Sequence, residues 1–265
     1  MKVGYFQYAV IWRDIQANLN YIASRVGDHK FDLLVLPEFF TTGYAVDQIT
    51  DILPFAEDLN DSQTVRYLTR LLTETGNGYI SGSIPEVDNG VLYNTSILVS
   101  AEGLVASYRK IHLPDYEKRF FRAGSKAVVH QGKQAQIGLT VCFDCWFPQH
   151  TSMLKSEGVE VVCHSACFGG PVTPTIIPIR ALENQCFYVS CNRVGEEYFD
   201  NELETYRGES QIVGPDGEVL AKAGREEALD FVEIDLTRVN KPSFGSLITK
   251  DFQSEHNKYT IQYES

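Results

Sequence analysis

Apolar and polar residues along the first half of the chain predict a strand–helix–strand–helix order. Residues 3–7 alternate, as in a strand, and Asp14 can cap a helix whose apolar residues recur every three or four positions up to Val26. The continuous apolar run 33–36 predicts a strand that is buried on both faces. Ser62 opens a second amphipathic helix, which ends near Gly76. Residues 79–85, 91–100 and 104–110 then predict an antiparallel meander joined by short turns.

The second half of the chain repeats this order. Strands are predicted at 136–142, 159–163 and 187–192, helices at 148–156 and 175–184, and a closing meander at 209–213, 218–221 and 230–234. Two helices cannot cover both faces of either sheet, so the sheets are expected to pack face to face with the helices outside. The predicted fold class is α/β, a four-layer α-β-β-α sandwich with two mixed sheets and internal pseudo-symmetry. Residues 1–265 are expected to form a single domain, with the polar segment 241–265 as an extended C-terminal tail.

Composition narrows the class of protein. The chain has 265 residues, of which 43% are hydrophobic, and a net charge of −12, as expected for a soluble enzyme with a substantial core. An acidic chain without a basic cluster is a poor partner for nucleic acid or for anionic membranes. No apolar run approaches transmembrane length. Six cysteines without a secretion signal indicate reduced thiols and a cytoplasmic location.

Three reactive side chains stand where predicted strands end. Cys142 lies between an apolar run and Pro148, on a sharp strand-to-helix turn of the kind that presents a nucleophile in serine hydrolases. Glu38 follows the buried run 33–36, and Lys110 ends the first meander. Taken singly, each has an ordinary interpretation. Cys142 can be a buried small hydrophobic residue, Glu38 a salt-bridged or capping carboxylate, and Lys110 a surface lysine.

Five motifs together resemble the nitrilase superfamily of carbon–nitrogen hydrolases. They are LVLPEFFTTGY, YRKIHLPDYEKRFF, GLTVCFDCWFP, PIRALENQCFYVSCNRVG and GESQIVGPDGEVLA, in family order and over nearly the whole chain. The resemblance implies the sandwich fold and a hydrolase that cleaves a non-peptide C–N bond through a cysteine thioester, without a cofactor or a metal. It implies a nucleophile at Cys142, a general base at Glu38, an oxyanion-holding lysine at Lys110 and a supporting glutamate at Glu117. It further implies a homodimer or larger assembly that meets through outer helices, with tails that cross the partner.

The candidate oxyanion and substrate-binding residues surround the cysteine. They are Phe143, whose backbone N–H is expected to assist Lys110, together with Trp146, Tyr44 and Phe168. Phe39, Phe143, Trp146 and Phe168 are expected to wall a narrow apolar pocket.

The residues that follow Cys142 bear on the substrate. Cys142-Phe143-Asp144 resembles the amidase branches, whereas nitrilases usually show Cys-Trp-Glu. Relatives that grip a carboxylate usually place an Arg two to four residues after the cysteine, and none stands there. Small neutral amides are therefore expected, unless Arg122, Arg180 or Arg193 reaches in from its own loop. An aliphatic nitrilase is one alternative. A carbamoylputrescine-type enzyme is another, because an acidic residue such as Glu196 would favour a cationic substrate.

Rival interpretations use the same cysteines. Cys142-x-x-Cys145 followed by Cys163 and Cys167 approximates a zinc-ribbon spacing, although the second pair has the wrong gap. Cys142 and Cys145 also form the spacing of a thioredoxin-like redox pair. A third alternative, from a different class, is a catalytically silent binding protein on the same fold. A turnover assay separates it from the enzyme.

Overall fold

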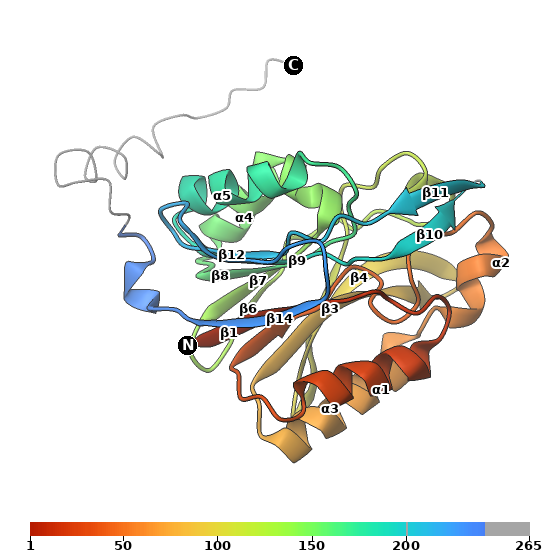
Figure 1. Ribbon diagram of the computed structural model, residues 1–265, viewed down its shortest axis with the longest axis horizontal. Helices are drawn as coiled ribbons and strands as arrows, with labels where there is room; N and C mark the ends of the chain where they lie inside the picture. Colours follow the sequence, from red (N-terminus) through yellow and green to blue (C-terminus); the bar gives the residue numbers. More distant parts are fainter. Residues whose placement is uncertain (200, 242–265) are drawn as a thin grey trace.

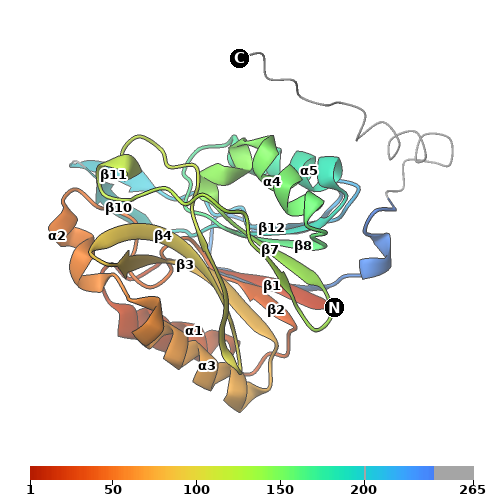
Figure 2. The ribbon, with the colours of Figure 1, turned by 180° about the vertical axis from the view of Figure 1, so that it is seen from behind.

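A computed structural model describes residues 1–199 and 201–241, which form four layers in the order helix, sheet, sheet, helix (Figures 1 and 2). The α-β-β-α sandwich predicted from the sequence is confirmed. The predicted tail, from residue 242 onward, lies outside the described residues. Within the described part of the chain, no helix has both the length and the apolar character needed to cross a membrane.

The first sheet has the strand order β14-β1-β2-β3-β4-β5. β1, β2 and β3 run parallel, and the remaining neighbours are antiparallel. The strands are β1 (Lys2–Gln7), β2 (Leu33–Val35), β3 (Tyr79–Asp88), β4 (Val91–Ser100), β5 (Gly103–Arg109) and β14 (Ala228–Glu233).

The second sheet has the order β13-β12-β9-β8-β7-β6, again with three parallel strands, β7, β8 and β9, at its centre. Its strands are β6 (Val129–Gln131), β7 (Gln136–Val141), β8 (Val161–Ser165), β9 (Phe187–Cys191), β12 (Gln211–Val213) and β13 (Val219–Lys222). The series β1 to β5 therefore matches the series β7, β8, β9, β12, β13, which is the internal repeat expected from the sequence.

Two helices cover the outer face of each sheet (Figure 1). They are α1 (Ile15–Val26) and α3 (Gln63–Thr75) on the first sheet, and α4 (Pro148–Ser156) and α5 (Thr173–Asn184) on the second. Asp14 and Ser62 cap α1 and α3 by accepting hydrogen bonds from backbone N–H groups of the first turn. Gly76 ends α3 with a left-handed backbone, at φ 65°.

The core has three layers. The largest cluster lies between the sheets and combines residues such as Val35 of β2 with Leu139 of β7 and Val189 of β9. A second cluster fills the space under α1 and α3, and another lies under α4 and α5. Since the inter-sheet cluster draws on both halves of the chain, neither half buries its inner face without the other.

Three sequence predictions of the strands were wrong in detail. The strand predicted at 159–163 is β8, and it starts two residues later, because the Val159 N–H bonds to Leu154 O at 3.1 Å and closes α4 instead. The strand expected to end at Pro85 continues to Asp88. At the level of Pro85, β3 has no β2 strand beside it, so a proline, which has no backbone N–H to donate, is tolerated there. The segment 230–234 was expected in the closing meander of the second half, but it does not join the second sheet. It forms β14, which pairs antiparallel with β1 and covers the edge of the first sheet.

Several short elements were not predicted. A hairpin of β10 (Glu196–Phe199) and β11 (Glu202–Thr205) stands apart from both sheets, at the same end of the sandwich as α2 (Ile49–Ile52) (Figures 1 and 2). The described residues also form five 3-10 turns: Leu53–Phe55, Leu59–Asp61, Glu117–Arg119, Cys142–Trp146 and Leu236–Arg238.

Candidate active site

Glu38, Lys110 and Cys142 meet at one end of the sandwich because β2, β5 and β7 all end there. Glu38 lies just beyond β2, Lys110 directly follows β5, and Cys142 directly follows β7. The carboxyl ends of parallel strands are where open α/β sheets place their ligands. Glu38 and Lys110 follow strands of the first sheet, and Cys142 follows a strand of the second, so the stacking of the two sheets brings Cys142 over Glu38 and Lys110.

Glu38 is fully buried, and its two carboxylate oxygens differ in their surroundings. Oε1 accepts hydrogen bonds from Lys110 Nζ at 2.8 Å and from Asn94 Nδ2 at 2.7 Å. Oε2 has no hydrogen-bond partner within the described part of the chain. Burial raises the pKa of Glu38 to about 7, although the Lys110 ammonium pulls it down. A carboxylate with this pKa and one free oxygen is suited to accept and return a proton near neutral pH.

Lys110 is fully buried between two carboxylates. Its Nζ lies 2.8 Å from Glu38 Oε1 and 2.6 Å from Glu117 Oε1. Burial lowers the pKa of Lys110, but Glu117 and Glu38 outweigh burial and hold it well above its ordinary value. The ammonium therefore stays charged. It has three N–H donors, of which two are used by the carboxylates, so one remains for a ligand.

Glu117 comes from the short turn Glu117–Arg119 and is almost completely buried. Tyr44 donates its hydroxyl hydrogen to Glu117 Oε1 and also contacts the Tyr116 hydroxyl. Asn94 Nδ2 lies 3.5 Å from Glu117 Oε2. The sequence placed Glu117 in a loop, and the structure brings it against Lys110.

Cys142 occupies the turn between β7 and the 3-10 helix Cys142–Trp146, with a left-handed φ of 41°. Such a backbone is strained for a residue other than glycine, and it is the conformation of a nucleophile elbow. His164 Nε2 lies 3.0 Å from the carbonyl oxygen of Cys142 and supports this turn. The thiol lies 3.8 Å from Cys167 O, and the side chain remains partly exposed. Burial, and then the negative charge of Glu38, raise the pKa of the Cys142 thiol, so a base must take its proton.

A cavity of about 400 Å³ opens directly over Cys142. The four residues predicted to bind substrate, Tyr44, Phe143, Trp146 and Phe168, all line it. Phe39, which was expected to wall the pocket, does not. It is fully buried and packs against Tyr44, with ring centroids 5.7 Å apart.

Sequence reasoning missed several residues at this site. The cavity is also lined by Tyr116, Cys167, Phe199, Glu204 and Tyr206. Asn94, which donates a hydrogen bond to Glu38, was not among the predicted site residues. A buried polar residue inside the apolar strand 91–100 was the signal that could have revealed it.

Cationic side chains proposed as possible carboxylate partners do not reach the cavity. Arg180 donates to Cys145 O at 2.8 Å and pairs with Glu183, and Arg193 is buried against Glu197. Neither they nor Arg122 line the cavity, and neither does Glu196. The one side chain with a formal charge among the described residues that line it is Glu204.

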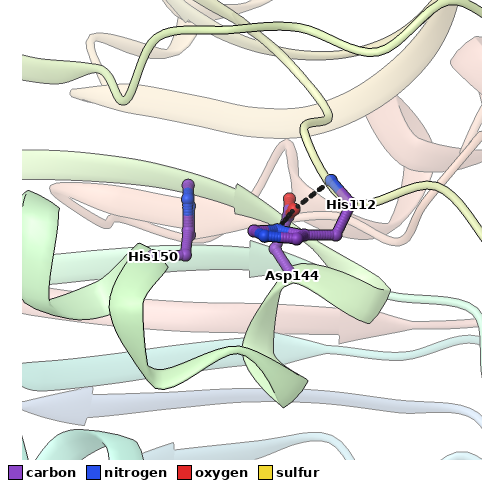
Figure 3. A group of neighbouring side chains, drawn as sticks. All are labelled: His112, Asp144 and His150. Atoms are coloured by element: carbon purple, nitrogen blue, oxygen red, sulfur yellow. Dashed lines mark hydrogen bonds and ion pairs between the residues drawn. The ribbon is translucent and has the colours of Figure 1, made fainter. Parts of the chain in front are cut away.

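Asp144 joins the cysteine turn to the end of β5 (Figure 3). Its Oδ1 accepts hydrogen bonds from the His112 N–H at 2.9 Å and lies 2.8 Å from His112 Nδ1. Its Oδ2 accepts from the Val141 N–H at 3.1 Å and from the Tyr108 hydroxyl at 2.8 Å. Although burial opposes it, these contacts with His112 lower the pKa of Asp144 below its usual value. The fully buried carboxylate thus fixes Val141, next to Cys142, to residues on either side of Lys110.

His112, Asp144 and His150 are also the group of described His, Cys, Asp and Glu side chains whose arrangement could hold a metal ion, with ligand atoms within 4.8 Å of one another. Figure 3 shows the ring of His150 beside His112 and Asp144, with no hydrogen bond or ion pair drawn to either of them. Both oxygens of Asp144 already accept two hydrogen bonds each, so the group is better described as a hydrogen-bonded brace than as a metal centre. The four cysteines of the zinc-ribbon spacing do not gather in the described structure.

Comparison with known proteins places this geometry in a family context. The family model described as carbon-nitrogen hydrolase matches residues 2–241. A nitrilase from Pyrococcus abyssi is 36% identical over 84% of this chain and 85% of its own length. An (R)-stereoselective amidase from Pseudomonas sp is 35% identical over 85% of this chain and 80% of its own length. A 2-oxoglutaramate amidase from Bacillus subtilis is 33% identical, with 77% of this chain and 78% of its own length covered.

Solved structures show the same fold. A CN-hydrolase superfamily protein from Xanthomonas campestris superposes with a TM-score of 0.83 at 22% identity, over 100% of this chain and 99% of that one. A mutant amidase from Nesterenkonia sp. AN1 carries the acetamide moiety of fluoroacetamide covalently at its active-site cysteine. It matches with a TM-score of 0.78 at 26% identity, over 90% of this chain and 92% of that one.

Proposed function

The chain belongs to the carbon-nitrogen hydrolase family, and on this premise we propose that it hydrolyses the C–N bond of small amides through a thioester on Cys142. In this assignment Cys142 is the nucleophile, Glu38 the general base and acid, Lys110 the oxyanion donor, and Glu117 the residue that orients Lys110. The relatives that are named amidases, and the covalent adduct on the cysteine of the Nesterenkonia enzyme, support this chemistry.

One observation carries the proposal. Buried Lys110 contacts both Glu38 and Glu117, close to the cavity that Cys142 lines. An amide is a poor electrophile with a poor leaving group. Its hydrolysis therefore needs a nucleophile, a proton carrier and a stabiliser of the developing oxyanion. The site supplies one residue of each type, and it holds the cation and the base in direct contact.

The steps follow from these positions. Glu38 takes the thiol proton while Cys142 Sγ attacks the amide carbonyl carbon. The free N–H of Lys110 and the backbone N–H of Phe143 hold the oxyanion, a contribution of roughly 3–4 kcal/mol per donor in other hydrolases. Glu38 then gives its proton to the leaving nitrogen, and ammonia or an amine departs from the thioester. Glu38 next activates a water molecule, which releases the acid and restores the thiol.

The cavity wall favours some amides over others. Trp146, Phe168 and Tyr206 make it largely apolar and aromatic, and no described lysine or arginine lines it. A carboxylate buried there would be an unpaired charge, which costs several kcal/mol. We therefore expect small amides without a carboxylate to be better substrates than carbamoyl amino acids or dicarboxylic monoamides. Similarity to the Pyrococcus nitrilase makes aliphatic nitriles the second candidate substrate class.

The direct test is ammonia release from a panel of propionamide, a carbamoyl amino acid, carbamoylputrescine and propionitrile. Wild type is expected to turn over an amide, whereas Cys142→Ala, Glu38→Gln and Lys110→Ala should each lose about 10³-fold or more in kcat, because each removes one catalytic role. Intact mass after acid quenching should show an acyl adduct on wild type and none on Cys142→Ala. Circular dichroism establishes that each variant is folded.

Two outcomes would overturn the proposal. Turnover by folded Cys142→Ala at the wild-type rate would remove the nucleophile assignment. Absence of any amide or nitrile turnover by wild type would favour the silent binding protein. A carbamoyl amino acid preferred by tenfold or more would contradict the specificity alone.

We further propose a cytoplasmic, single-domain protein that assembles as a homodimer. All six cysteines lie in the described part of the chain and are free thiols, which supports a reducing compartment. The core shared by both sheets supports one domain for residues 1–241. Exposed apolar side chains on the outer helices support assembly, and they include Met153 of α4 and Ile179 of α5.

A further inference from the structure

Among the described residues that line the cavity, one side chain is negatively charged and none is positively charged. Glu204 of β11 is the one carboxylate that lines it, and within the described residues no lysine, arginine or histidine lines it. Glu204 is exposed and has no hydrogen-bond or ion-pair partner in the described part of the chain. The binding site of a small neutral molecule has no need for such a group.

The carboxylate opposite Glu204 in the hairpin already has a cation of its own. Glu204 stands directly opposite Glu197 in the β10–β11 hairpin, so both side chains lie on the same face. Glu197 is buried and has its own cation, Arg193, as well as hydrogen bonds from the Tyr44 and Ala45 N–H groups. Arg193 is thereby committed to Glu197. It is not available to Glu204, which leaves this carboxylate to be paired by a cation that a ligand supplies.

Glu204 is held at a fixed place relative to the nucleophile. Thr205 O approaches Gly169 so closely that a Cβ on this glycine would lie only 2.6 Å away, and the Arg207 N–H bonds to Phe168 O at 3.0 Å. These contacts anchor the end of β11 to the loop 167–169. The same loop carries Cys167 O, which lies 3.8 Å from Cys142 Sγ. Glu204 and Cys142 are therefore placed on the same cavity by one short segment.

Aromatic rings line the cavity that Glu204 and Cys142 share. They include Tyr116, Phe199 and Tyr206, with the Tyr116 and Phe199 rings packed edge to face at 5.4 Å. Aromatic faces attract an ammonium group and also accept the methylene groups that lead to it. An anion has no comparable partner along this path.

We propose that Glu204 and these aromatic rings form a subsite for an ammonium group, so that the preferred substrates are primary amides with a positively charged far end. This inference rests on the proposed function, in which the amide carbonyl sits at Cys142. Hydrolysis adds water, breaks the C–N bond and releases ammonia and an amino acid. Glu204, and not Glu196, is the acidic residue that selects the cation, because Glu196 lies outside the cavity.

The test compares matched amides that differ in charge alone. 4-Aminobutanamide carries an ammonium at neutral pH, pentanamide replaces it with a methyl group, and succinamate carries a carboxylate. The kcat/KM of wild type is expected to be about tenfold higher for 4-aminobutanamide than for pentanamide, equivalent to about 1.4 kcal/mol, and lowest for succinamate. The series from 3-aminopropanamide to 6-aminohexanamide finds the best spacing. The ratio should fall as salt is added, because Glu204 is exposed and salt screens exposed charges.

Charge variants assign the effect to one residue. Glu204→Gln should bring the ratio to within about twofold of one, and Glu204→Lys should favour succinamate over 4-aminobutanamide. Glu196→Gln removes the same charge from the same hairpin at a position outside the cavity, and it should keep the wild-type ratio. A loss of folding lowers all rates together, whereas the ratio reports the subsite.

A ratio of one or less across the whole aminoamide series would overturn the subsite, as would a Glu204→Gln ratio equal to that of wild type. If wild type turned over no amide at all, the proposed function would fail instead. In that case, calorimetry tests the subsite. The affinity for 4-aminobutanamide is measured for the Cys142→Ala variant and for the double variant Cys142→Ala, Glu204→Gln. Binding that does not depend on Glu204 would overturn it.

Discussion

At the scale of single residues, the site depends on whether the buried Glu38 carboxyl group is protonated. Glu38 has a pKa of about 7 because burial disfavours its charge, while Lys110 and Asn94 favour it. Asn94 donates to Oε1 at 2.7 Å, a bond that stabilises the ionised form. Asn94 thus helps to keep Glu38, the proposed base, ionised near neutral pH.

The pH profile of Asn94→Ala tests this role. Glu38 must be ionised to take the thiol proton, so kcat/KM of wild type should fall as the pH falls through about 7. Loss of the Asn94 hydrogen bond raises the pKa of Glu38, and the acid limb should move to higher pH. Thr95→Val removes a buried hydrogen bond from the same strand, to Glu86, and should leave the limb in place. An identical acid limb in wild type and Asn94→Ala would contradict this assignment.

The sequence reveals some of these residues and hides others, for physical reasons. Glu38, Lys110 and Cys142 follow strands with strong apolar patterns, so their shared position at the strand ends is predictable. Asn94 lies within a strand, where its neighbour Glu38 is 56 positions away in sequence, and no local pattern reports such a pair. Glu204 lies in an exposed hairpin segment without alternation, so neither its strand nor its cavity could be expected.

At the scale of elements, the turn after β7 and the end of β5 act as one unit. Asp144 accepts hydrogen bonds from Val141 N–H on one side and from His112 and Tyr108 on the other. Cys142 and Lys110 are the neighbours of these groups in sequence. Their relative position therefore depends on one buried carboxylate.

Asp144→Asn should lower kcat by about 10- to 100-fold, because a small displacement of reacting groups is costly. It should also destabilise the fold by about 1–3 kcal/mol, since an amide cannot accept all four hydrogen bonds of the buried carboxylate. KM should change much less than kcat, and alkylation of Cys142 by iodoacetamide should slow. Cys145→Ala, a buried neighbour in the same 3-10 turn, should keep most of the activity. Equal effects of both substitutions on kcat would contradict a positioning role for Asp144.

The order of the strands and the antiparallel pairing of β3, β4 and β5 could be predicted from the apolar pattern and the short turns, whereas the partner of the last strand could not be. β14 was located as a strand near its observed bounds, but its pairing with β1 depends on the open edge of the first sheet. β6 has only three residues, two half-buried and one exposed, which are too few for an alternating pattern. Strand pairing is a property of the folded sandwich, whereas strand formation is largely local.

At the scale of the whole molecule, the two halves place the site between them and leave their helices outside. α4 and α5 lie side by side on the outer face of the second sheet (Figures 1 and 2). On this face Met153 is 47% and Ile179 is 48% exposed. Apolar side chains gathered on one outer face mark a surface for association. In the proposed homodimer, this face would make the outer-helix contact that the family resemblance implies.

We expect the full chain to be a dimer by light scattering at micromolar concentration, since an interface of about 800 Å² per partner is sufficient for a stable pair. Met153→Glu combined with Ile179→Glu should yield a folded monomer, because two charges on each partner would face an apolar surface. Ile49→Glu introduces a charge on the exposed short helix α2, at the end of the sandwich beside the β10–β11 hairpin and away from α4 and α5, and should leave the dimer intact (Figure 1). A wild-type monomer would contradict the assembly, and a dimeric double variant would move the interface away from α4 and α5.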